Sequence, residues 1–342
     1  FATGLLVLSL AFVAVTFFLL ARDTHHEQQW LSLATDVQVT SQQLAKSAGE
    51  AASGNLNAFL ELGNARDKIQ SAMQKLRSGS QYPSFPATPD AVDTEMRQLS
   101  QTWSRMEANA ANILNRESLI LELASARDLI RNSIPGIQKS TDDSLRALTK
   151  SGAPSNQLVF ASRQLVLADR ILRRVAEVLR GGSNAVAAAE NLGKDNDLFA
   201  QVLNSLLEGS ARLGVSQVRN SQALQSLGQV KALFENIKPP IGAILNSSTD
   251  LFEVRGAADE IFLDSRDVFD QASSLRNAIT ELPENRLWPS LTSGIIGLLI
   301  MMSAVWMLLH SFLSAERQRA KLAADSNQKN QQAILKLLDE MS

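Results

Sequence analysis

The sequence has no cysteine and a single tyrosine, and aromatic residues make up only 5% of its 342 positions. Without cysteine the chain has no disulfide framework, no cysteine-ligated zinc or iron–sulfur site and no thiol nucleophile. It also lacks an excess of charge of one sign, because 33 Lys and Arg face 35 Asp and Glu. A protein that binds duplex DNA normally carries a large basic excess, so we expect no nucleic-acid partner.

Motifs of enzymatic chemistry are missing as well. The sequence contains no glycine-rich phosphate loop, no serine nucleophile elbow and no His-Glu-x-x-His motif. Its three histidines do not suit a metal site, because His25 and His26 would point about 100° apart on a helix and His310 is distant in the sequence. We therefore predict that the chain is not an enzyme and holds neither a metal nor a cofactor.

Two long stretches of the sequence carry no charged residue. The first covers residues 1–21, and a helix of that length reaches about 31 Å, enough to cross the hydrocarbon core of a membrane. The second covers residues 287–315 and has Trp288 and Trp306 near its ends, as is typical of membrane interfaces. We predict transmembrane helices at residues 1–21 and 287–313. A signal peptide is the alternative for the first stretch, although no cleavage site of alternating small residues follows it.

The residues beyond the second stretch predict its orientation. Arg317, Arg319 and Lys321 follow closely, and basic residues at a membrane exit mark the cytoplasmic side. Residues 22–286 are then expected on the outer side. Because the sequence begins inside an apolar stretch and without methionine, we also expect a cytoplasmic leader before it.

The last residues have the pattern of an amphipathic helix. Ile334, Leu337, Leu338 and Met341 share one helical face, and such a helix needs a partner to be stable in water. Residues 314–342 are therefore predicted to form a cytoplasmic helical linker and the start of a HAMP-like helix. The segment is similar to the first helix of a HAMP relay domain, with Ala333 where a proline is usual.

Apolar residues of the middle segment repeat with helical spacing. A 3-4 alternation runs from Leu31 to Leu76, and a similar seam begins at Leu158, 158 − 31 = 127 residues later. Further matches pair residues 113–115 with 244–246, at an offset of 244 − 113 = 131. Their common register predicts a tandem repeat on the outer side of the membrane, with one copy at residues 22–150 and a second at 151–286.

These patterns predict an all-α fold: an elongated antiparallel helical bundle of two stacked four-helix modules, built from the tandem repeat and flanked by two transmembrane helices. Each repeat is expected to rise for about 50 residues, turn at the end far from the membrane and return over about 60. Breaks near residues 181–184 and 246–250 would divide the bundle into its two modules. One four-helix bundle per repeat remains an alternative.

The proline-rich segment Ser78–Asp90 is the predicted turn of the first repeat. We expect it at the far end of the bundle, where Tyr82 and Phe85 are candidate residues for docking a partner. The alternative is an ordinary connection whose aromatic rings cover the end of the bundle. The seam residues Ala45, Ala48 and Ala52 are small and should pack closely, so we expect a protein or mechanical cue rather than a metabolite in a deep pocket.

The assembled pieces resemble a known receptor family, the twitching-motility methyl-accepting chemotaxis transducers of type IV pilus systems. The resemblance rests on residues 162–171, 195–199, 250–255 and 333–341. Residues 163–170 are similar to the Arg-Gln-x-x-Leu-Ser-x-Arg signature of sensor domains related to nitrate sensors, with Ala168 in place of serine.

The resemblance implies a dimeric, two-pass receptor of the bacterial inner membrane with its sensor in the periplasm. It implies a HAMP relay to a CheA-like kinase and a coupling protein, which together control twitching, and a pilus protein is a further candidate partner at the periplasmic tip. The alternatives are the sensor portion of a membrane histidine kinase and a helical tether that does not signal.

The signature contains the candidate ligand or dimer-interface residues Arg163 and Arg170. They are seven residues apart, and heptad counting from Leu158 places both at outward f positions. Facing their symmetry mates in a dimer, the two guanidinium groups could bind an anion, whereas the alternative is a pair of solvated arginines. Gln42 and Gln43 of the first repeat complete the candidate set, but that stretch has no arginine, so two symmetric ligand sites are not expected.

Overall fold

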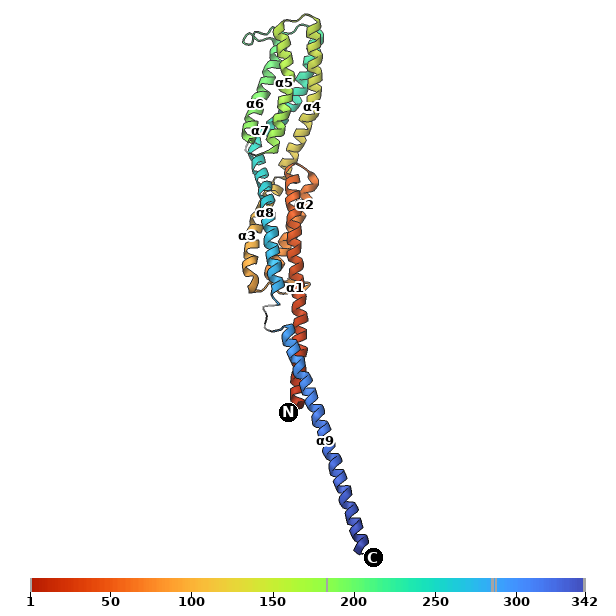
Figure 1. The fold of residues 1–342 in the computed structure, drawn as a ribbon. Coiled ribbons are helices and arrows are strands. Elements are labelled where there is room, and N and C mark those ends of the chain that lie inside the picture. Colours follow the sequence, from red (N-terminus) through yellow and green to blue (C-terminus); the bar gives the residue numbers. More distant parts are fainter. Residues whose placement is uncertain (1, 183, 284–285, 287, 341–342) are drawn as a thin grey trace. The chain divides into compact units, whose positions relative to one another are not determined.

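The computed structural model describes residues 2–182, 184–283, 286 and 288–340, and they are almost entirely helical (Figure 1). The elements, in chain order, are α1 (Ala2–Ala52), α2 (Leu56–Ser78), β1 (Ser80–Gln81), β2 (Ser84–Phe85), a 3-10 turn (Asp90–Val92), α3 (Asp93–Asn115), α4 (Glu117–Lys150), α5 (Ser155–Arg180), α6 (Ala185–Glu208), α7 (Ser221–Asn246), α8 (Ser248–Glu281) and α9 (Leu291–Glu340). The predicted all-α class is confirmed.

The described residues form two compact units. One contains residues of 1–32, 80–86 and 276–342, and the other contains residues 33–79 and 87–275. In the first unit, α1 and α9 are the two helices that, by length and composition, could cross a membrane. They approach closely, because a Cβ at Gly297 would lie 2.9 Å from Cδ1 of Phe12, and Trp288 Nε1 donates to Thr16 Oγ1 at 3.1 Å. Residue 287 and the final Met341 of the predicted stub lie outside the described residues.

The second unit contains two four-helix modules. The first module consists of residues 33–52 of α1, α2, α3 and residues 248–275 of α8. Contacts run around this ring of helices: Asp36 pairs with Lys68 at 2.9 Å, Gln70 accepts from Trp103 at 2.8 Å, Arg105 pairs with Asp264 at 2.7 Å, and Gln42 donates to the carbonyl of Ser265 at 3.0 Å.

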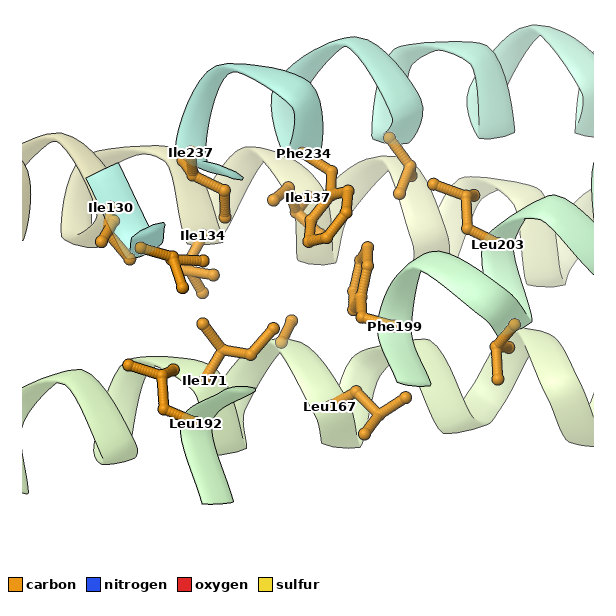
Figure 2. Close-up of a cluster of buried hydrophobic side chains, with 14 of the residues drawn as sticks. Ile130, Ile134, Ile137, Leu167, Ile171, Leu192, Phe199, Leu203, Phe234 and Ile237 are labelled. Atoms are coloured by element: carbon orange, nitrogen blue, oxygen red, sulfur yellow. The ribbon is translucent and has the colours of Figure 1, made fainter. Parts of the chain in front are cut away.

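The second module consists of α4, α5, α6 and α7, which lie side by side in Figure 1. Figure 2 shows its core, in which Ile134 and Ile137 of α4 and Ile171 of α5 face Phe199 of α6 and Phe234 of α7. The two phenylalanine rings stack with their centroids 4.5 Å apart. These apolar side chains recur at helical spacing on all four helices, and burying them together is what stabilises the module.

Two helical connections join the modules. Arg116 links α3 to α4, and Ser247 links α7 to α8. Arg116 also ties the two connections together, because its guanidinium pairs with Asp250 at 3.3 Å and with Glu253 at 2.5 Å, both on α8.

The helix bounds show the tandem repeat directly. α4 and α8 begin at Glu117 and Ser248 and end at Lys150 and Glu281, and both differences, 248 − 117 and 281 − 150, equal 131. The strand pairing of Ser80 with Phe85 likewise has a counterpart 130 residues later, in the bridge between residues 210 and 215.

The sequence repeats do not coincide with the four-helix modules, because the last helix of each repeat packs in the module formed by the other repeat. The first module takes α1, α2 and α3 from the first repeat and α8 from the second, whereas the second module takes α4 from the first repeat. The alternative of one bundle per repeat is therefore wrong within this chain. The predicted boundary at residue 150 separates repeats but not modules.

The expected position of the Ser78–Asp90 segment at the far end of the bundle is also wrong. The strands β1 and β2 belong to the unit of α1 and α9, and Trp30 Nε1 donates to the carbonyl of Pro86 at 2.9 Å. The reason is a turn at Gly54, which has φ 88°, after which Asn55 caps α2 and the chain returns alongside α1.

Candidate functional site

The predicted pair Arg163 and Arg170 lies on α5 of the second module, but the two side chains have different surroundings. Arg163 is exposed and makes no ion pair with the residues that the structure describes. Arg170 turns toward α6, where its Nη2 lies 2.5 Å from Oδ1 of Asp195. The outward position predicted for Arg170 is therefore wrong, because α5 packs against both α4 and α6 and so buries a wider arc than the single seam assumed in heptad counting.

Asp195 is the most deeply buried carboxylate of this region, with 3% of its side chain exposed against 42% for Arg170. Nearby on α5, Gln164 is fully buried and its Nε2 donates to the carbonyl of Phe199 at 3.0 Å. Gln164 Oε1 and Asp195 Oδ2 are buried and have no hydrogen-bond partner among the described residues. We call Gln164, Arg170 and Asp195 the polar cluster of the second module.

The polar cluster has no counterpart in the first repeat. The offset of 127 residues carries Gln164 to Val37 and Arg170 to Gln43, and the offset of 130 carries Asp195 to Ala65. Gln43 is exposed, while Gln42 donates to the carbonyl of Ser265 on α8. The structure thus does not bring Gln42 and Gln43 together with the two arginines, because the two pairs belong to different modules.

Sequence reasoning missed the part played by Asp195. Asp195 is one of the residues that carry the family resemblance, but local spacing does not pair it with Arg170, because the two are separated by 195 − 170 = 25 residues and a turn. A usable signal was the charged residue at a seam position of α6, between the core residues Leu192 and Phe199.

The docking candidates Tyr82 and Phe85 lie on the short hairpin of β1 and β2 and point differently. Tyr82 is 91% exposed, whereas Phe85 is 5% exposed. Only the tyrosine ring is therefore available to a partner in this conformation.

A charged contact that the sequence analysis did not predict joins the segments next to the two apolar helices. Nη1 of Arg286 lies 3.0 Å from Oδ2 of Asp23, and its Nη2 lies 3.2 Å from Oε1 of Glu27. The two acidic residues are one turn apart on α1. Burial raises the pKa of the Glu27 carboxyl above its ordinary value, and the charge of Arg286 opposes that shift in part. For the adjacent His26, burial and then the charge of Arg22 lower the pKa. We call Asp23, Glu27 and Arg286 the clasp.

The chemistry of these groups is charge pairing and hydrogen bonding. Within the described residues, no three carboxylate or imidazole side chains come together in a way that could hold a metal ion. The polar cluster and the clasp each hold charged groups in place between two segments.

Comparison with known proteins gives this geometry a context. Residues 22–128 match the family described as type IV pili methyl-accepting chemotaxis transducer N-term. Protein PilJ of Pseudomonas aeruginosa is 34% identical over 337 residues, which is 98% of this chain and 49% of that protein. A putative methyl-accepting chemotaxis protein, AlkN of Alcanivorax borkumensis, is 35% identical over 342 residues and 48% of its own length. The chain spans about half the length of these relatives, and the predicted resemblance is confirmed.

Proposed function

We propose that this chain is the sensor and membrane portion of a transmembrane chemoreceptor of type IV pilus systems, because residues 22–128 match the N-terminal family model of those transducers. The observation that carries the proposal is the extent of the identity, which covers 98% of the chain and so includes both repeats and both apolar helices. The receptor acts by binding and conformational change and is not an enzyme.

In this proposal the receptor crosses the bacterial inner membrane twice through α1 and α9. Residues 22–286 form a periplasmic sensor, and residues 314–342 lead into a HAMP relay that controls a CheA-like kinase through a coupling protein. The clasp supports this arrangement, since it bonds the outer end of one apolar helix to the segment before the other. Because Arg286 precedes α9, a small displacement of α1 would reach α9 through the clasp, and shifts of about 1–2 Å are the ordinary scale of such signals.

The receptor is proposed to act as a homodimer in which Arg163 faces its symmetry mate. Arg163 is exposed and Arg170 is held against Asp195, so Arg163 is the better placed of the two to meet an anion or a partner subunit. A pilus protein docking at Tyr82 is a further proposed contact, supported by the exposure of that ring.

The native absence of cysteine makes the dimer directly testable by single-cysteine crosslinking in membranes. Cysteines placed one at a time at positions 291–309 of α9 should form disulfides between subunits with a period near 3.6 residues, because one face of each helix meets the other subunit. A flat profile would contradict the dimer.

Deletion of the chromosomal gene that encodes this protein tests the receptor function itself. Loss of the protein should abolish pilus-dependent twitching, and the coding sequence after residue 342 should continue into a HAMP module and a long heptad-repeat segment. Normal twitching without the protein would contradict the proposal. A catalytic kinase domain after residue 342 would instead identify the sensor portion of a histidine kinase.

A further inference from the structure

A groove runs along the first module between α2 and α3. Its volume is about 330 Å³, and the residues that carry its chemistry are Gln70, Met73, Arg77, Ser100, Trp103 and Glu107. The expectation of little concave volume rested on the alanines of α1, whereas this groove lies beside larger residues of α2 and α3. Ligand pockets begin at about 300 Å³, so the groove suits a small molecule.

The floor of the groove is apolar and fixed in place. Trp103 and Met73 are both nearly buried, and the indole Nε1 donates to Gln70 Oε1 at 2.8 Å, which holds the ring in one orientation. The hydroxyl oxygen of Ser100 is buried at this groove and has no hydrogen-bond partner among the described residues. A buried polar atom without a partner is costly, so a rotation of the Ser100 side chain that lets its hydroxyl bond to a ligand would be favourable.

The two charged residues of the groove lie toward opposite ends. The Gln70–Trp103 bond sets the register of the antiparallel helices. Arg77 lies seven residues beyond Gln70, about 10 Å along α2, and Glu107 lies four residues beyond Trp103, about 6 Å the other way. Neither residue makes an ion pair with the described part of the chain. The groove therefore presents a cation and an anion that are both unpaired and well separated.

The second repeat provides an internal comparison. At the equivalent positions, Gln70 is replaced by Ala200, Trp103 by Phe234 and Glu107 by Lys238. Leu207 takes the place of Arg77, and Phe234 stacks on Phe199 inside the core. Since α6 and α7 form the equivalent helix pair without these side chains, the fold does not require the polar and charged residues of the groove.

We propose that the groove between α2 and α3 binds a short peptide of about three residues with free ends. An extended chain advances about 3.3 Å per residue, so three residues span about 10 Å, and the flexible side chains of Arg77 and Glu107 cover the remaining distance to its ends. Arg77 binds the terminal carboxylate, Glu107 binds the terminal ammonium group, Ser100 bonds to the peptide backbone, and the side chains lie on Trp103 and Met73. The role of the peptide as a cue rests on the proposed receptor function, whereas its binding does not.

Isothermal titration calorimetry of the full chain in lipid nanodiscs tests the proposal, with trialanine as the probe. We expect saturable binding of trialanine and binding at least tenfold weaker for acetyl-trialanine-amide, whose ends are uncharged. Arg77→Gln and Glu107→Gln should each weaken trialanine binding about tenfold or more, because each removes one charge-assisted contact.

Control substitutions on α3 separate this site from general charge effects. Arg97→Gln and Glu95→Gln lie on α3 outside the groove and should leave trialanine binding unchanged. Arg77 and Arg97 are exposed and Glu95 and Glu107 are half-buried, and circular dichroism verifies that each variant is folded. The proposal is overturned by the absence of trialanine binding at millimolar concentration, by equal binding of the blocked peptide, or by unchanged binding in both groove variants. Because the measurement is of binding alone, its failure leaves the receptor function untouched.

Discussion

Asp195 places a carboxylate inside the second module and depends on one guanidinium for its charge balance. An ionised carboxylate that loses water costs several kcal/mol unless it is paired and hydrogen-bonded. Arg170 supplies the pair at a modest desolvation cost, because part of its own side chain stays in water. The arginine is thus a structural partner of Asp195 in addition to any part in ligand binding.

Arg170→Gln should therefore destabilise the protein by about 1–3 kcal/mol, because it leaves a buried acceptor without its partner. Thermal unfolding of the full chain, followed by circular dichroism, measures the change. Arg163→Gln is the matched control, since that side chain is exposed on the same helix, and its effect should stay within about 0.5 kcal/mol. Equal stability of the two variants would show that the Asp195 pair contributes nothing.

Two turns at equivalent places in the repeats fit tightly against the last helix of their own repeat. Gly54 follows α1 and Gly181 follows α5, and both have positive φ. A Cβ at Gly54 would lie 2.5 Å from Cβ of Ala124 on α4, and one at Gly181 would lie 2.6 Å from Cγ of Arg255 on α8. Ala124 and Arg255 are equivalent, because 255 − 124 = 131. The same close approach therefore forms twice, at the junction of the modules.

Only one of these two close approaches has further hydrogen bonds, because Arg255 can make them and the equivalent Ala124 cannot. Its guanidinium donates to Ser53 Oγ and to the carbonyl of Leu179, both at 3.2 Å. Burial lowers the pKa of Arg255 from its ordinary value, because the protein around the guanidinium excludes water.

Gly54→Ala should cost roughly 2–5 kcal/mol. A Cβ at positive φ costs roughly 1–2 kcal/mol, and the overlap with Ala124 adds typically 1–3 kcal/mol. Gly152→Ala serves as the control, because Gly152 has φ 65° and open space around it, so only the backbone cost of roughly 1–2 kcal/mol applies. Chemical denaturation of the two variants gives the comparison, and an equal loss of stability would mean that the contact with Ala124 is not tight.

These turns also show where prediction from the sequence succeeds and where it fails. Helical periodicity predicts the helices and the repeat, because a helix that buries one face needs apolar residues at helical spacing along that face. The seam spacing continues from Ala52 through Asn55 to Phe59, so the pattern did not reveal that the chain reverses at Gly54. The polar cluster and the groove depend on pairs such as Arg170 with Asp195, or Gln70 with Trp103, and no local spacing specifies which helices become neighbours.

For the molecule as a whole, the exchange of last helices makes the folding unit different from the sequence repeat. Residues 117–246 hold all four helices of the second module, whereas residues 151–281 hold the second repeat and lack α4. Without α4 the core loses Ile130, Ile134 and Ile137, and the apolar residues that face them are left exposed.

The two fragments have nearly equal lengths and give a sharp test. Residues 117–246 should form a soluble helical protein that unfolds cooperatively with heat, and residues 151–281 should show weak helicity and no cooperative transition. Circular dichroism and size-exclusion chromatography distinguish the outcomes. A cooperative, monomeric fold of 151–281 would show that a repeat suffices as a unit.

The same exchange determines the order in which the modules can be completed during synthesis. Between the end of α3 and the start of α8 lie 248 − 115 − 1 = 132 residues, so α1, α2 and α3 are made long before the helix that closes their module. At about 5–20 residues per second this delay is on the order of 10 s, and the second module is complete before it ends. The usual order, in which the N-terminal part folds first, is therefore reversed. The apolar faces of the three early helices remain uncovered while they emerge, which leaves them open to binding by a chaperone.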